Sequence, residues 1–255
     1  MIPRALTIAS SDSGGGAGIQ ADLKAFAAAG CHGMSAIVAL TAQNTVGVTA
    51  IHELPPEFVV AQLEAVFNDI GVDAAKTGML FSARLIETVA AFLEEHRVPL
   101  VVDPVMLASS GARLLQDDAV STLVSRLFPL ATAVTPNLNE AEVLAGVSAS
   151  RRELAERIHE LGAPAAIVTD GGSGDAYFDG ETALELPVRR HETAATHGSG
   201  CTHSATLAAL LARGEGLLSA AAVAAATASD AVGHGLSELG AGEGPVDVFH
   251  LARAR

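Results

Sequence analysis

The sequence predicts an α/β fold, a three-layer αβα sandwich with a mostly parallel central sheet and a small added hairpin. Three observations support this prediction. Short apolar segments alternate with amphipathic segments of helix length along nearly the whole chain. Some of the short segments are apolar at every position, as strands buried on both faces of a sheet are. No linker or charge block divides the 255 residues, so we expect a single domain over residues 1–255.

The composition narrows the class of function. The formal net charge of −14 argues against a nucleic-acid partner, because phosphate backbones are bound by clustered Lys and Arg. An anionic ligand would need backbone amides, a metal ion or a few cations. Cys31 and Cys201 form no disulfide or zinc pattern, and no signal peptide or apolar run of membrane length is present. We therefore expect a cytoplasmic protein that does not associate with a membrane.

The first strand, Ala5–Ala9, leads into a glycine-rich loop, Ser10–Gly18, and then into a helix over Ile19–Ala29. The glycine spacing matches neither the dinucleotide fingerprint nor the P-loop. It is typical of a loop that lets a ligand approach the backbone at a strand's carboxyl end. Asp22, one turn inside the helix, could point back over a pocket or could be a solvated surface carboxylate.

The second strand, Ser35–Leu40, ends in a polar cluster, Thr41–Thr45. Gln43 in this cluster offers both a donor and an acceptor, which suits a heterocycle with a ring nitrogen beside an amino group. An extended connection, Val46–Leu54, follows. Two prolines then open an amphipathic helix that runs to about Gly71.

A third strand, Asp73–Thr77, leads towards Met79, which could pack in the core or contact a ligand. A helix over Ser82–His96 and a fully apolar strand, Pro99–Val102, come next. A buried run that ends in a carboxylate is typical of a central parallel strand. Asp103 is therefore a candidate site residue.

A helix over Asp117–Phe128 and a strand over Ala131–Thr135 precede a helix start that carries Asn137 and Glu140. These two residues are three apart, so their side chains can face one spot. A carboxylate and an amide oxygen suit a hydrated Mg²⁺ ion, but the same pair could form an ordinary capping box. The residues alone leave both interpretations open.

The remaining elements continue the alternation. A helix over Arg151–Leu161 is followed by a strand over Ala165–Thr169. Segments at Asp175–Phe178 and Thr182–Leu186 are separated by a turn and predict a hairpin. A long helix over Leu217–Val232 precedes a glycine-rich tail.

Between the hairpin and that last helix, Gly198–Cys201 leads into a helix predicted over Thr202–Arg213. Free amides and the positive end of the helix dipole make such a junction an anion hole, and the same field would lower the pKa of the Cys201 thiol. The alternative is an ordinary turn beside an inert, buried cysteine. Because the candidate groups all fall at strand carboxyl ends or helix amino ends, a functional site is favoured.

Taken together, the segments resemble the hydroxymethylpyrimidine/phosphomethylpyrimidine kinases of thiamine biosynthesis, within the ribokinase-like superfamily. The resemblance covers almost the entire chain, and six motifs in the right order make it specific. They are SDSGGGAGIQADLK, TAQNT, LPPEFVVAQLEAVFNDIGVDAAKTGML, VVDPVM, TPNLNEAE and HGSGCT.

The resemblance implies a single ribokinase-like kinase domain that uses ATP and Mg²⁺ and forms a homodimer. It also implies roles for particular residues. Cys201 would replace the catalytic Asp that most of the superfamily carries, and Gly198, Ser199 and Gly200 would form the anion hole. The other implied positions are Asp22, Gln43, Met79 and Val105 in the pyrimidine pocket, Asn137, Thr169 and Gly171 at ATP and phosphate, and Asp103 and Glu140 at the metal.

Two departures concern the nucleotide. The family commonly has Lys-Gly-Gly where this chain has Thr169–Gly172, and a related enzyme would carry Lys at the position of Ala241. If both cations are absent, either Mg²⁺ and Lys76 must offset more of the triphosphate charge or the nucleotide binds in a different position.

The expected activity is ATP-dependent phosphorylation of 4-amino-5-hydroxymethyl-2-methylpyrimidine and then of its monophosphate. Two alternatives remain at this point. One is a pyridoxal kinase of the cysteine type, and the other is a non-catalytic pyrimidine-binding protein of the same fold. Gln43 within TAQNT favours the pyrimidine, and the intact Cys201, Asn137 and Glu140 favour an enzyme.

Overall fold

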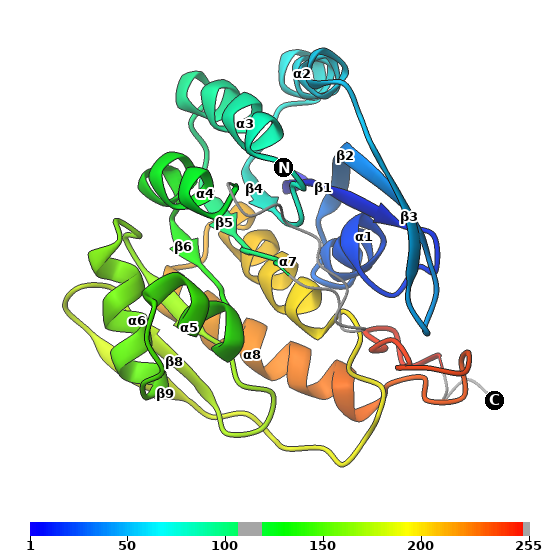
Figure 1. Ribbon diagram of the computed structural model, residues 1–255, viewed down its shortest axis with the longest axis vertical. Coiled ribbons are helices and arrows are strands. Elements are labelled where there is room, and N and C mark those ends of the chain that lie inside the picture. The colour runs from blue at the N-terminus through cyan, green and yellow to red at the C-terminus, as the bar shows by residue number, and fades with distance from the viewer. Residues whose placement is uncertain (107–118, 252–255) are drawn as a thin grey trace.

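The computed structural model describes residues 1–106 and 119–251 (Figure 1). Within these residues, nine strands form one sheet in the order β3-β2-β1-β4-β5-β6-β7-β8-β9. The strands are β1 (Arg4–Asp12), β2 (His32–Gln43), β3 (Val48–Glu53), β4 (Ala74–Thr77), β5 (Leu100–Val102), β6 (Ala133–Val134), β7 (Ala166–Val168), β8 (Asp175–Phe178) and β9 (Ala183–Leu186).

The middle of the sheet is parallel, as the sequence predicts. Strands β2, β1, β4, β5, β6 and β7 run the same way. At one edge β3 pairs antiparallel with β2, and at the other edge β8 pairs antiparallel with β7 and β9 pairs antiparallel with β8. The chain turns from β1 outwards to β2 and later returns on the other side of β1 to β4. Such a reversal of strand order leaves a crevice at the carboxyl ends of the strands, which is where open α/β sheets bind ligands.

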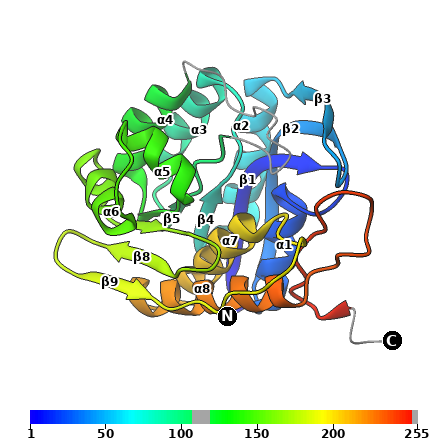
Figure 2. The same cartoon turned by 60° about the horizontal axis from the view of Figure 1, so that its bottom comes forward.

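Helices cover both faces of the sheet, which confirms the three-layer prediction (Figure 2). In the described part of the chain, three α-helices pack in one hydrophobic core cluster and five α-helices pack in the other, on the opposite face of the sheet. On the first face lie α1 (Gly18–Ala28), α7 (Ser199–Ala212) and α8 (Leu217–Gly233). On the second lie α2 (Pro56–Ala65), α3 (Ala83–Glu95), α4 (Ala119–Leu127), α5 (Leu138–Ala145) and α6 (Arg151–Glu160).

Side-chain alternation along the strands explains why both faces are covered. In β5, Leu100 and Val102 pack against the layer of α2 to α6, whereas Val101 packs against the layer of α1, α7 and α8. The layer of α1, α7 and α8 is rich in alanine, and these small side chains let α8 pack closely against α7. Six alanines form the buried face of α8, namely Ala220, Ala221, Ala224, Ala225, Ala228 and Ala231.

Within the described residues, three of the differences between the structure and the sequence prediction concern the site or the type of element. The connection predicted over Val46–Leu54 contains β3, whose backbone pairs with β2 at the sheet edge. The helix predicted to run to Gly71 changes at Val66–Ile70 into a π-helical turn. The sequence did not predict this turn, because an apolar stripe does not reveal a change in hydrogen-bond spacing. The third is α7, which begins at Ser199, three residues early.

The predicted hairpin is confirmed as β8 and β9. The start predicted for the α4 helix, Asp117, lies outside the described residues. Among the helices that the structure describes, none combines the length and apolar character needed to cross a membrane.

Candidate active site

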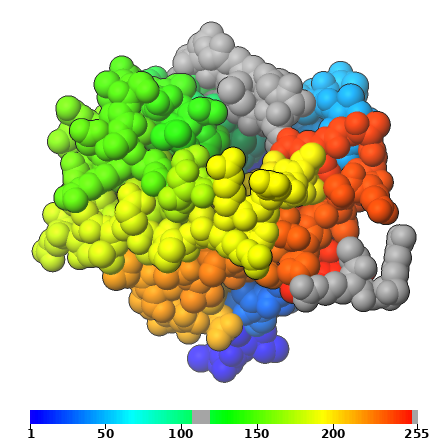
Figure 3. All heavy atoms as spheres, turned by 90° about the horizontal axis from the view of Figure 1, so that it is seen from below, coloured from blue at the N-terminus to red at the C-terminus, as the bar shows by residue number. Residues whose placement is uncertain are grey.

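A cavity of about 360 Å³ opens at the carboxyl edge of the parallel strands. Its size is that of a small-molecule site. In Figure 3 the surface is hollowed where green, yellow and orange-red segments meet. The cavity wall contains every predicted site residue except Asp22, namely Gln43, Met79, Asp103, Val105, Asn137, Glu140, Thr169, Gly171, Gly198, Ser199, Gly200 and Cys201.

The first turn of α7 forms the floor of this cavity. Gly198 caps the helix in the left-handed region, with φ at +82°, and a Cβ there would collide with the backbone oxygen of Gly16. Glycine is therefore required at this position. Ser199, Gly200 and Cys201 are the first three helical residues, and amides in a first helical turn lack intrahelical partners. The arrangement supports an anion hole within the helix itself rather than in a loop before it.

The Cys201 thiol is not the acidic group that the helix terminus suggested. Burial raises its pKa to about 12, and the negative charges of Asp22 and Asp103 act in the same direction. The positive charge of Lys76 and the Gly18 amide oppose these effects but do not outweigh them. The prediction of a lowered pKa is therefore wrong for the unliganded protein, because desolvation exceeds the helix field.

Lys76 lines the cavity from within a buried charge network. Its ammonium is 2.9 Å from Asp22 Oδ1 and 3.4 Å from Asp103 Oδ2. Burial alone would lower the pKa of Lys76, but the two facing carboxylates outweigh it and raise that pKa. Lys76 is thus already neutralised within the protein and does not supply the free cation expected for the triphosphate.

Asp22, predicted to line the substrate pocket, is not among the residues of the cavity wall. The structure places it behind the cavity wall, fully buried, where Thr7 Oγ1 donates to it at 2.6 Å and Lys76 holds both of its oxygens. The helix position one turn after the glycine loop was correctly identified, but α1 turns this face towards the sheet. Asp22 therefore positions Lys76 instead of lining the pocket.

Asn137 and Glu140 form a capping box at the start of α5. The Glu140 amide donates to Asn137 Oδ1 at 2.9 Å, and the Asn137 amide donates to Glu140 Oε2 at 3.0 Å. The capping interpretation is correct, yet both residues also line the cavity beside Asp103. The two interpretations do not exclude one another.

Glu140 has the electrostatics of a carboxylate that faces a cation site. Burial and then the charge of Asp103 raise its pKa to about 8, against hydrogen bonds from the Asn137 and Met106 amides. Two carboxylates thus share one wall, and ionising both there is unfavourable without a positive charge between them. This donor set fits Mg²⁺, which prefers carboxylate oxygens and retained water.

Asp12, which the sequence prediction missed, organises the glycine loop. Its carboxylate accepts from the amides of Gly14 at 2.8 Å, Gly16 at 3.0 Å and Ala17 at 2.9 Å. His197 Nε2 lies 3.2 Å from its Oδ2. Burial alone would raise the pKa of Asp12, but these hydrogen bonds lower it. An Asp two residues before a glycine run is the local signal that could have identified this role.

The cavity wall also has a part that combines polar and apolar groups. Gln43 Oε1 accepts from Thr41 Oγ1 at 3.0 Å, and its amide nitrogen is 3.5 Å from His197 Nε2. Met79 and Val105 supply apolar surface beside it, and Ser10 Oγ donates to the Met79 sulfur at 3.2 Å. Met79 thus belongs to both the core and the cavity wall.

A second cavity of about 100 Å³ adjoins the first. It shares Thr169, Gly171, Thr196, Ser199 and Gly200 with the first cavity and continues to alanines of α8. The sequence prediction missed this cavity, because its wall combines the hairpin side of the sheet with α7 and α8.

The second cavity also contains His203, whose Nε2 is 3.4 Å from Asp175 Oδ2. Asp170 stands where the Lys-Gly-Gly motif would place its lysine, and its Oδ2 is 3.8 Å from Nη1 of Arg151. Arg151, from α6, therefore supplies a cation beside this position. Ala241 is exposed and lines neither cavity.

Comparisons with known proteins agree with this geometry. The chain is 48% identical over 257 residues to the hydroxymethylpyrimidine/phosphomethylpyrimidine kinase of Rhizobium meliloti, with 96% of this chain and 97% of that protein covered. It is 49% identical over 252 residues to the thiamine biosynthesis bifunctional protein ThiED of Geobacter sulfurreducens, with 95% of this chain and 51% of that protein covered.

Among solved structures, an ADP complex of Bacillus subtilis pyridoxal kinase matches with a TM-score of 0.90 and 36% identity, covering 99% of each chain. The predicted ribokinase-like fold is therefore confirmed. The family model of phosphomethylpyrimidine kinase matches residues 12–247. Because that match and the relatives extend over nearly the whole chain, the protein belongs to the phosphomethylpyrimidine kinase family.

Proposed function

We propose that the protein transfers the γ-phosphoryl group of ATP to 4-amino-5-hydroxymethyl-2-methylpyrimidine and then phosphorylates the monophosphate, in thiamine biosynthesis. One observation carries this proposal: a single cavity is lined by the first turn of α7, by Gln43 with apolar neighbours, and by the acidic Asp103 and Glu140. An acceptor on one side and a polyphosphate on the other would meet at that turn.

The first turn of α7 would stabilise the transferring group. Phosphoryl transfer has little covalent chemistry for a protein to perform, so positioning and charge stabilisation dominate. Amides of Ser199 and Gly200, aided by the helix dipole, suit the charge on the equatorial oxygens. These donors are held in place before the reaction, because Gly198 fixes the start of the helix.

Cys201 lies at this turn and would accept the proton of the attacking alcohol as its thiolate. The second reaction needs no base, because its nucleophile is a phosphate that is already ionised near neutral pH. One site could therefore perform both reactions with different demands on Cys201.

Asp103 and Glu140 would hold Mg²⁺, and Asn137 would contact the phosphates beside it. Bound Mg²⁺ supplies charge neutralisation for the polyphosphate. The residues prepare this wall: Ser204 Oγ donates to Asp103 at 2.8 Å, and the capping box fixes Glu140. The second cavity, reached past Thr169 and Gly171, would take the nucleoside of ATP.

A pyridoxal kinase is the second candidate, and the match to the Bacillus subtilis pyridoxal kinase complex favours it. A coupled assay of ATP consumption with Mg²⁺ would offer the pyrimidine alcohol, its monophosphate and pyridoxal separately. We expect turnover of both pyrimidines. Turnover of pyridoxal alone would establish the second candidate, and no turnover of any of them would favour a non-catalytic binding protein.

Gln43→Leu sharpens this test, since it keeps the volume but removes donor and acceptor. We expect the KM for the pyrimidine alcohol to rise about tenfold, the equivalent of about 1.4 kcal/mol. The control is Met79→Leu, a volume-conserving change at the same end of the cavity, which we expect to alter KM only slightly. Equal effects of the two changes would contradict recognition by Gln43.

We further propose that the protein is a cytoplasmic homodimer and that residues 1–255 form a single domain. The formal net charge of −14 supports partners that are small molecules and not nucleic acids. Light scattering on the purified protein tests the dimer, and a mass equal to one chain would contradict it.

A further inference from the structure

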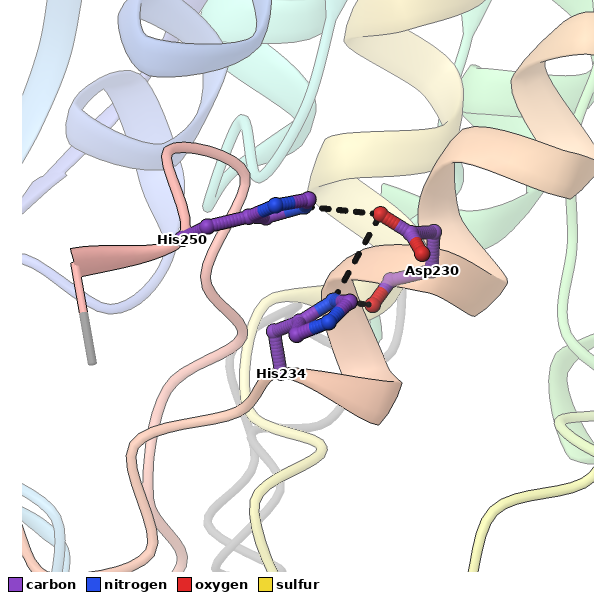
Figure 4. A group of neighbouring side chains, drawn as sticks. All are labelled: Asp230, His234 and His250. Carbon is purple, nitrogen blue, oxygen red and sulfur yellow. Dashed lines mark hydrogen bonds and ion pairs between the residues drawn. The ribbon is translucent and has the colours of Figure 1, made fainter. Parts of the chain in front are cut away.

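Three side chains that could bind a metal lie together at the C-terminal end of α8. Figure 4 shows Asp230 and His234 on this helix, with His250 reaching over from the chain's C-terminal segment. Their ligand atoms all lie within 4.8 Å of one another. None of the three lines either cavity of the active site.

The distances suit a small, borderline metal ion. Asp230 Oδ2 is 2.8 Å from His250 Nε2 and 3.5 Å from His234 Nδ1. Ligands at about 2.0–2.2 Å from a tetrahedral Zn²⁺ ion are separated from each other by roughly 3.3–3.6 Å. Opening these contacts, together with the 2.9 Å hydrogen bond between His234 Nδ1 and the Asp230 carbonyl oxygen, would admit the ion between the three atoms.

The surroundings favour a cation. The site lies at the end of a helix, where the dipole is negative, on a chain with a formal net charge of −14. The exposed fractions of the three side chains are 58% for Asp230, 36% for His250 and 18% for His234, so an ion can enter from solvent. Two imidazoles and one carboxylate are a ligand set that Zn²⁺ accepts, with water at the fourth position.

The arrangement of the two imidazoles is also informative. The rings of His234 and His250 stack with centroids 4.0 Å apart. His250 also has a φ of +56°, a conformation that residues with a side chain rarely adopt, and this backbone places the ring over Asp230.

We propose that Asp230, His234 and His250 form a binding site for one Zn²⁺-type transition-metal ion. The bound ion would fasten the C-terminal segment to α8. The loop between the two histidines also contacts the active-site side, where the His197 amide donates to Gly244 O at 3.1 Å. The site is thus separate from the kinase cavity but lies at the base of a loop that supports it.

The test titrates metal-free protein with Zn²⁺ in competition with a chromophoric chelator, without ATP or Mg²⁺, and repeats the titration with Co²⁺ followed by visible absorption. We expect one ion per chain for the wild type. In His234→Ala and in His250→Ala the dissociation constant should rise more than about tenfold, since loss of even an outer partner of a metal ligand costs that much. His32→Ala, an exposed histidine at the start of β2, is the control and should bind as the wild type does.

Thermal unfolding gives a second readout that does not depend on activity. Zn²⁺ should raise the Tm of the wild type and of His32→Ala but not of the two cluster variants. Equal Tm values of all four proteins without metal would show that the variants fold. Zn²⁺ binding by either cluster variant as tight as that of the wild type would overturn the proposal, as would the absence of binding by the wild type.

Discussion

The protonation state of Cys201 should make the two phosphoryl transfers respond differently to pH. Because burial raises the thiol pKa to about 12, roughly one thiol in ten thousand is ionised at pH 8. If that thiolate accepts the proton of the alcohol, the first reaction should accelerate about tenfold per pH unit between pH 7 and 9. The second reaction should be almost flat in this range, because the acceptor phosphate has a pKa of about 6.

Cys201→Ala should abolish the pH slope of the first reaction and slow it by about 100-fold or more, while the second reaction changes far less. Single-turnover measurements at saturating ATP and Mg²⁺ would isolate the transfer step from product release. Cys31→Ala is the matched control, since Cys31 is buried against α7, where its thiol donates to Ala209 O at 3.3 Å. A flat profile for the wild-type first reaction, or equal losses in both reactions, would refute the base role and leave Cys201 a structural or anion-hole role.

Three further predictions concern the buried charges and the helix start. Between about pH 4.5 and 8, Glu140 binds a proton in the folded state but not in the unfolded one, so the free energy of unfolding should fall as pH rises, by at most about 5 kcal/mol. Urea titrations should show that this free energy falls less steeply with pH in Glu140→Gln. An unchanged dependence on pH would contradict the raised pKa. Lys76→Met should destabilise the protein by about 3–5 kcal/mol, because it leaves Asp22 unpaired. Adding Asp22→Asn should recover part of this loss in the same urea titration. Additive losses would argue against the ion pair between Lys76 and Asp22. Gly198→Ala should reduce both activities and lower Tm, because the new Cβ meets Gly16 and the residue has a positive φ. The control Gly200→Ala, with open space at its Cβ, should leave Tm nearly unchanged. Equal Tm values of the two variants would show that the helix cap at Gly198 relaxes.

Local patterns in the sequence determined the fold class and several candidate residues of the cavity wall. Alternating strand and helix patterns require parallel strands with helices on both faces, and parallel strands bring their carboxyl ends to one edge. This is why the sequence predicts one site for Gln43, Asp103 and Asn137, which are far apart in the chain and line the same cavity. The capping pattern at Asn137 and Glu140 is local as well, and the structure shows the capping box that was one of the two interpretations the sequence left open.

Only the tertiary structure decided what the buried charges do. Asp22 and Lys76 are 54 residues apart, and Asp12 and His197 are 185 apart, so no local pattern could pair them. The pKa of Cys201 shows the same limit, because the helix field is local whereas desolvation and the charges of Asp22 and Asp103 come from other elements. Periodicity and helix termini act over a few residues and can be read from the chain, whereas burial and charge pairing depend on which distant segments the fold brings together.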